Sequence, residues 1–195
     1  MPSNRFENET SPDLARWAAW LTLLALGACA VDRSGRGPLV GGGGICTECG
    51  ACEETLPVTS ALHVTGKVDY PDVPPVGGPH SACWGPWGVQ DEPLRPERWV
   101  HNLEHGGVVF LYRCDDGCDA EVTELKALAA AHDRTILTQY DALPKRFAAV
   151  SWGWRLVSDC LDLAAFEAFY EDHYDRAPES IGAAPAAQCA QFPDL

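Results

Sequence analysis

The stretch that decides the fold runs from Trp99 to Tyr112 and reads WVHNLEHGGVVFLY. Its second half, Val108–Tyr112, is a run of apolar residues, which is typical of a strand in the centre of a sheet. In its first half, His101 and His105 are four residues apart, so their side chains share a face only if the segment is helical. Gly106 ends any helix there. The stretch therefore predicts one turn of helix followed by a central strand.

Short regular elements surround this strand. Further strands are predicted over Ala61–Thr65, Thr135–Tyr140 and Ala148–Val157. Amphipathic patterns predict two main helices, over Ala120–His132 and Leu163–Tyr174. The order of these elements predicts an α+β fold: a single small domain with a mixed or antiparallel sheet, two main helices and Pro/Gly-rich loops.

Composition excludes several classes of protein. The chain has 195 residues, of which 46% are hydrophobic and 22% charged, as expected for one compact globular domain. Lys and Arg number 14 against 28 Asp and Glu, which gives a net charge of −14. Nucleic-acid binding needs a basic face, and so does a polybasic membrane-surface module. We therefore expect neither, and in particular no nucleic-acid partner.

The N-terminal region has the pattern of an export signal. Trp17–Ala28 is an apolar run of 12 residues, too short for a helix that crosses a bilayer about 30 Å thick. The run ends in Leu-Gly-Ala-Cys29, which resembles the lipobox of bacterial lipoproteins. We therefore predict a lipoprotein signal peptide over residues 1–28, a flexible Gly/Cys-rich tether over 29–58 and the folded α+β domain over 59–195. A buried N-terminal helix is the alternative for the first segment.

This signal predicts a place in the cell. Cys29 would carry the lipid and anchor the protein to a membrane of the cell envelope, facing the periplasm, with the outer membrane as the expected one. The remaining eight cysteines are an even number in an exported chain, which favours disulfides. Candidate pairs are Cys114 with Cys118 across a short acidic turn, and Cys160 with Cys189.

A second group of cysteines allows more than one interpretation. Cys46, Cys49 and Cys52 form a C-x-x-C-x-x-C run in the predicted tether. An iron–sulfur or zinc site built on this run would need a fourth ligand, such as Cys83 or a remote histidine. One or two oxidised pairs are the simpler interpretation, so the run is kept as a secondary thiol site.

Four of the six histidines fall in one half of the domain: His63, His80, His101 and His105. Several neutral imidazoles that converge would suit copper or zinc and would be poor ligands for calcium or magnesium. Cys83 is a possible additional ligand, and Glu104 is expected to orient one of the histidines. The alternative is that these histidines only hydrogen-bond to buried backbone.

The segment His101–His105 also matches H-x-x-E-H, the inverted zincin signature of certain zinc proteases. In that family the motif lies on a long helix. Here two glycines and an apolar strand follow at once, so the context argues against a protease.

Two blocks of sequence carry a family resemblance: Pro74–His80, which reads PPVGGPH, and His101–Gly106, which reads HNLEHG. In this order they resemble the bacterial family known as domain of unknown function 3105, over about residues 61–180. The resemblance implies an exported or membrane-anchored protein whose four histidines form one site. It implies no particular metal or activity.

These observations lead to one main functional hypothesis. The chain is expected to be an envelope lipoprotein with a His-rich copper or zinc site that binds or delivers the metal. A metal-dependent oxidoreductase or hydrolase with an open coordination position is the alternative. A module for interaction with a protein partner of unknown identity, without metal, is the further alternative.

Overall fold

A mixed sheet and three helices make up the regular structure of this computed structural model, which describes residues 45–46, 49–115 and 117–180. The strands are β1 (Ile45–Cys46), β2 (Cys52–Thr55), β3 (Gly88–Val89), β4 (Val108–Tyr112), β5 (Thr135–Gln139), β6 (Phe147–Ser151) and β7 (Trp154–Ser158). The helices are α1 (Pro96–Glu104), α2 (Asp119–Ala131) and α3 (Leu163–His173). The predicted α+β fold is confirmed, with α1 in addition to the two main helices.

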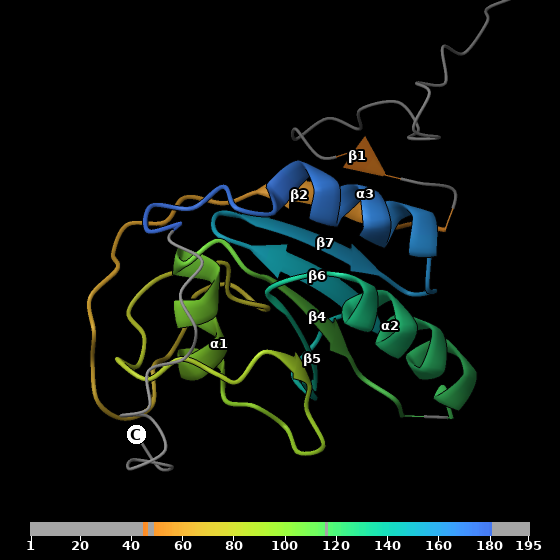
Figure 1. Cartoon of the computed structure of the whole chain (residues 1–195), viewed down its shortest axis with the longest axis horizontal. Coiled ribbons are helices and arrows are strands. Elements are labelled where there is room, and N and C mark those ends of the chain that lie inside the picture. The colour runs from red at the N-terminus through yellow and green to blue at the C-terminus, as the bar shows by residue number, and fades with distance from the viewer. Residues whose placement is uncertain (1–44, 47–48, 116, 181–195) are drawn as a thin grey trace, which may run out of the picture.

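The seven strands lie in the order β1-β2-β7-β6-β4-β5-β3. Strand β5 is parallel to β3 and β4, and the other neighbouring pairs are antiparallel. As predicted, Val108–Tyr112 is an inner strand, because β4 has a paired neighbour on each side (Figure 1).

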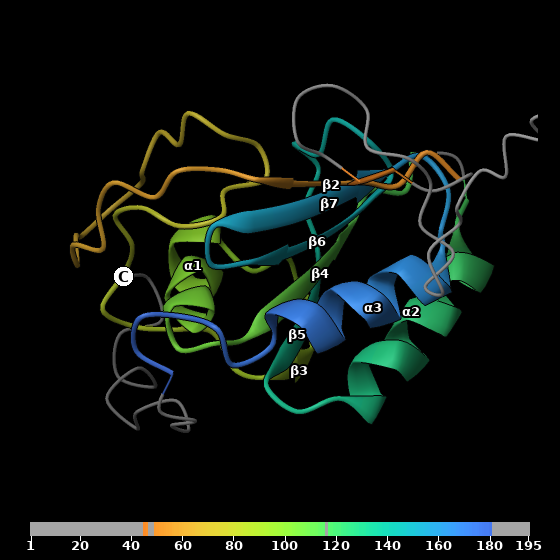
Figure 2. The same ribbon diagram turned by 90° about the horizontal axis from the view of Figure 1, so that it is seen from above.

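Successive residues of β4 face two separate cores, which explains why the strand is apolar throughout. Val108 and Phe110 pack in one cluster with side chains of α2 and α3, including Leu125 of α2. Val109 and Leu111 pack in a second cluster with side chains of α1. Helix α1 lies on one side of β4 and β5, and α2 and α3 lie together on the other (Figure 2). Alternate residues of a strand point to opposite faces, so a strand covered on both faces needs an unbroken apolar run.

Two strand predictions need correction. Ala61–Thr65 forms no strand, and its only pairing is an isolated bridge between His63 and His80. Ala148–Val157 contains two antiparallel strands, β6 and β7, joined by a tight turn. Gly153 has φ +79° in that turn, a conformation that glycine adopts without strain.

Helix α1 is longer than the single turn predicted. It begins at Pro96, and proline fits the first turn of a helix because it needs no amide donor there. It ends at Glu104, with His105 as the C-cap and Gly106 at φ +79°. A Cβ atom on Gly106 would lie 2.9 Å from Cα of Asp175, so the segment after α3 packs closely against this end of α1.

The predicted tether is wrong over its last part. Strand β2 pairs with β7 along its whole length, and Ala51 is fully buried. Glu53 is also buried and lies 3.0 Å from Nε2 of His173 in α3. The folded part therefore begins before residue 59. The predicted signal peptide, Cys29 and the start of the tether lie outside the described residues.

Several of the described cysteines form disulfides, as predicted for an exported protein. The predicted disulfide between Cys114 and Cys118 is present. Cys160 is bonded to Cys49, so the predicted pair of Cys160 and Cys189 is wrong. Cys189 lies outside the described residues.

Cys52 is also disulfide-bonded, so both described thiol positions of the run, Cys49 and Cys52, are oxidised. The run therefore does not offer these thiolates to an iron–sulfur cluster or zinc ion.

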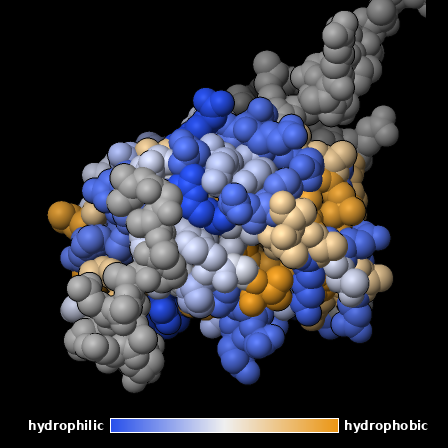
Figure 3. Space-filling model, in the orientation of Figure 1, coloured by the Kyte–Doolittle hydropathy of each residue, from blue (hydrophilic) through white to orange (hydrophobic). Residues whose placement is uncertain are grey.

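The molecular surface is mainly hydrophilic on the face shown in Figure 3, with small apolar patches between the polar areas. Leu62 and Val89 are the large apolar side chains that are exposed among the described residues. Within the same residues, no helix combines the length and the apolar character that crossing a membrane requires.

Candidate metal centre

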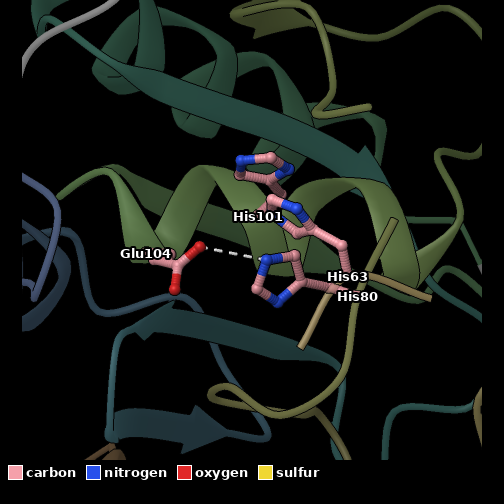
Figure 4. Close-up of side chains that lie close together, drawn as sticks. All are labelled: His63, His80, His101 and Glu104. Carbon is pink, nitrogen blue, oxygen red and sulfur yellow. Dashed lines mark ion pairs between the residues drawn. The ribbon is translucent and has the colours of Figure 1, made fainter. Parts of the chain in front are cut away.

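Three of the predicted histidines and one carboxylate converge beside α1 (Figure 4). His63, His80, His101 and Glu104 each offer one ligand atom, and these atoms lie within 4.8 Å of one another. His101 and Glu104 are three residues apart on α1, so helix geometry puts both on one face. The imidazoles and the carboxylate point toward one another, as Figure 4 shows.

The other two histidines of the group are brought together by main-chain hydrogen bonds. The amide of His80 donates to the carbonyl of Leu62 at 3.0 Å, and the amide of Val64 donates to the carbonyl of His80 at 2.8 Å. This short parallel bridge places His63 beside His80 and extends the Pro/Gly-rich loop toward α1. The predicted strand is absent here, and a single bridge positions both rings.

Main-chain carbonyl groups fix the orientation of three imidazoles. In each case Nδ1 lies close to a carbonyl oxygen: His80 with Gly78 at 2.8 Å, His101 with Ser81 at 2.7 Å, and His105 with Glu179 at 2.9 Å. A carbonyl oxygen only accepts, so each Nδ1 carries the hydrogen and each neutral ring has its lone pair on Nε2. Histidines that bind metals characteristically donate their second ring nitrogen in this way.

The Nε2 atom of His80 is the most unusual group in the site. The side chain is fully buried, and Nε2 makes no hydrogen bond among the described residues. It lies 3.0 Å from Oε2 of Glu104. With the ring hydrogen on Nδ1, a lone pair faces a carboxylate oxygen, and the two repel each other. A proton or a metal ion between them removes this repulsion.

Burial favours the neutral form of two imidazoles in this group, the form that can bind a metal. Desolvation lowers the pKa of His80, and it lowers the pKa of His101 to about 4 although the bond to Ser81 opposes the change. Both imidazoles are therefore neutral at pH 7, with their lone pairs available. For Glu104 the effect is opposite: desolvation raises the pKa of its carboxyl group, which favours the protonated form, and a metal ion has to displace that proton.

The fourth predicted histidine lies at the edge of this group. Nε2 of His105 is 2.9 Å from Nε2 of His101. Its ligand atom belongs to a second group, formed with Glu104 and Glu179, whose ligand atoms also lie within 4.8 Å of one another. The four histidines are thus adjacent, but they divide into two groups that share Glu104.

Two carboxylates, those of Glu104 and Glu179, lie beside the predicted histidines. Glu104 is predicted only to orient a histidine, but one of its carboxylate oxygens lies among the nitrogen atoms that could hold a metal. Its spacing of three residues from His101 on a helix was the available signal. Glu179 was not predicted as a ligand, and it lies 74 residues from His105 in the sequence.

Cys83 does not extend the site as a thiolate. It is buried, but it is disulfide-bonded. A sulfur in a disulfide has no thiolate charge to offer a metal, so the suggestion that Cys83 adds a soft ligand is wrong for the oxidised protein.

Aromatic rings enclose the inner side of the site. The ring of Trp84 lies 4.2 Å from that of His105 and 5.2 Å from that of His101, measured between centroids. Trp152 packs edge-on against His80 at 6.2 Å. His63 is exposed and lines a surface hollow, so the site is closed on the inside and open to solvent beside this one ligand.

Comparison with known proteins places this site within a family. A family model described as "Protein of unknown function (DUF3105)" matches residues 63–190, a range that begins at His63 and includes Glu179. No curated protein and no solved structure matches the chain.

Proposed function

The chain belongs to the DUF3105 family, proteins of unknown function, and we propose that it binds a divalent transition-metal ion, copper first and zinc second. The ligands are His63, His80, His101 and Glu104. The observation that carries this proposal is the buried Nε2 of His80, which makes no hydrogen bond within the described part of the chain and faces Oε2 of Glu104 at 3.0 Å. A metal ion between the two atoms would bind the lone pair of His80 and the carboxylate of Glu104 together.

The ligand types select the class of metal. Imidazole nitrogens suit copper and zinc, whereas calcium and magnesium require mostly oxygen ligands. Copper(II) also has the higher intrinsic affinity of the two. Nε2 of His80 and Oε2 of Glu104 are 3.0 Å apart. If a metal lies about 2.1 Å from each of these atoms, the angle between its two bonds is about 90°. That angle fits tetragonal copper(II) better than tetrahedral zinc(II).

The site needs little rearrangement before it binds. Ligand atoms around one metal are separated by about 4 Å at most, and the described atoms lie within 4.8 Å of one another. His63 is exposed, so its side chain has room to move by this difference. The buried rings of His80 and His101 are already held by their bonds to main-chain carbonyls.

We further propose that the protein works at the cell envelope, as a lipoprotein that holds or delivers the metal. The lipobox-like end of the apolar run at Cys29 supports the lipid anchor. The disulfides Cys49–Cys160 and Cys114–Cys118 support an oxidising compartment. An exposed ligand, His63, supports exchange of the metal with a partner at the open side.

The same exposed ligand also favours one alternative function. If His63 leaves the metal, a coordination position opens toward solvent, as in catalytic sites. A metal-dependent oxidoreductase or hydrolase would then use the three buried ligands. Turnover of oxygen or peroxide by the copper-loaded protein would favour this alternative, and its absence would favour metal binding or delivery.

Metal binding is tested on the full-length chain with its disulfides intact. The chain is stripped with a chelator, loaded with one equivalent of Cu(II), and examined by electron paramagnetic resonance and elemental analysis. We expect bound copper with hyperfine splitting from nitrogen ligands. In His80→Asn, the amide replaces Nδ1 as donor to Gly78 but no atom replaces Nε2, so tight binding should be lost.

His132→Asn is the matched control, because His132 packs against Tyr170 of α3 and not beside the site. It should retain the copper and the spectrum of the unaltered chain. Equal copper content in His80→Asn and the unaltered chain would refute the proposed ligand set, and no bound copper or zinc in the unaltered chain would refute the function.

A further inference from the structure

We infer that the protein has a second cation site beside the first, formed by His105, Glu179 and the outer oxygen of Glu104. This inference rests on the proposed function, because Glu104 would bridge the two ions. The ligand atoms of these three residues lie within 4.8 Å of one another. One imidazole and two carboxylates suit zinc(II).

The first argument is the contact between His105 and His101. Both rings donate from Nδ1 to main-chain carbonyls, so when both rings are neutral their Nε2 lone pairs face each other across 2.9 Å. Both side chains are only 6% exposed, so water does not screen the repulsion. A metal on His101 alone would leave the lone pair of His105 without a partner. A second cation supplies that partner.

The second argument is the orientation of Glu104. One carboxylate oxygen faces Nε2 of His80, and the other points away from the three imidazoles of the first group (Figure 4). A carboxylate with its oxygens directed to two sides can bind one ion with each. Metal ions bridged in this way lie about 3.5–4 Å apart in two-metal sites.

The third argument is the way in which the segment after α3 holds Glu179. The amide of Glu179 donates to the carbonyl of Glu104 at 3.1 Å, and the carbonyl of Glu179 accepts from His105. The amide of Asp175 donates to the carbonyl of Gly106 at 2.9 Å. These bonds fix the backbone of Glu179 across the end of α1, while its side chain remains exposed where an ion can enter.

The number of bound zinc ions tests the inference. The full-length chain, stripped and then saturated with Zn(II), is separated from free metal and analysed for zinc per chain. We expect two ions in the unaltered chain and one in Glu179→Gln, which removes a charged ligand from the second site only. Glu171→Gln, on the exposed face of α3, removes an equal charge elsewhere and should retain two.

His105→Asn provides a second variant that does not depend on Glu179. Asparagine can still donate to the carbonyl of Glu179 in place of Nδ1 but has no counterpart of Nε2, so it should also bind one ion. Copper gives an independent signal: two bridged Cu(II) ions should couple magnetically and weaken the resonance of the unaltered chain. Glu179→Gln should restore the spectrum of a single Cu(II).

The outcomes separate this inference from the proposed function. One zinc ion in the unaltered chain would overturn the second site and leave the first intact. Two ions in both Glu179→Gln and His105→Asn would overturn the assigned ligands. No zinc and no copper in the unaltered chain would overturn both the second site and the proposed function.

Discussion

Acid should destabilise the metal-free protein through His101. Burial lowers the pKa of this imidazole to about 4 in the folded chain, and an unfolded histidine has a pKa of about 6.5. The unfolded state therefore binds a proton first as pH falls, and the free energy of unfolding decreases between pH 6.5 and 4. A difference of about 2.5 pKa units corresponds to about 3 kcal/mol, and His101 is too buried for solvent to reduce it much.

The assay is urea unfolding of the full-length chain, followed by tryptophan fluorescence in the presence of a chelator. At pH 7, 5.5 and 4, His101→Asn keeps a donor to the carbonyl of Ser81 but cannot be protonated. Its free energy of unfolding should therefore decrease less, by about 3 kcal/mol over this range, than that of the unaltered chain. The unaltered chain should exceed His101→Asn in free energy of unfolding by the largest amount near pH 7. His132→Asn serves as the control variant. Parallel curves for the unaltered chain and His101→Asn would refute the assignment of a buried, neutral imidazole.

Three further predictions concern stability. Cu(II) at about 1,000 times its dissociation constant should raise the free energy of unfolding by about 4 kcal/mol in the unaltered chain and by much less in His80→Asn, as measured by urea unfolding. Replacing Cys49 and Cys160 by serine opens a loop with a sequence separation of 111 residues, which should lower the unfolding free energy by about 2–5 kcal/mol without changing metal content. Gly106→Ala forces an alanine to φ +79° and a Cβ atom to 2.9 Å from Asp175. It should cost at least about 1–2 kcal/mol, and calorimetry that shows an unchanged melting temperature would contradict the close packing.

The centre of the fold was predictable because its patterns are long and local. The apolar run Val108–Tyr112 and the periodic segments that became α2 and α3 each carry their own signal. Strand β2 has no such local signal in its sequence. It reads CEET, without apolar alternation, and its partner β7 lies about a hundred residues later in the sequence. Such a strand is fixed by long-range pairing, which a reading of local sequence does not contain.

The clustering of the histidines was predictable from the sequence, but their division into two groups was not. The number of histidines and the spacing of His101 and His105 pointed to a common region, and the structure places the four side chains close together. The grouping depends on the directions of Nε2 atoms, and these are set by carbonyl groups of Gly78, Ser81 and Glu179. Main-chain carbonyls are present at every residue, so the sequence holds no sign of which three will be used.

The position of α1 explains how a pair of charged ions could sit beside an apolar core. One face of the helix packs Trp99, Val100 and Leu103 against the sheet, and these residues are fully buried. The other face presents His101 and Glu104 to the loop that carries His80. Apolar packing therefore holds the helix whether or not a metal is bound, and the carbonyl bonds hold the rings. Ligand side chains that are already oriented lose little conformational entropy when the metal binds. The binding free energy is therefore reduced only slightly by the cost of ordering them. On this reasoning metal removal should leave the fold intact and lower its stability, in contrast to small metal-dependent domains that unfold without their ion.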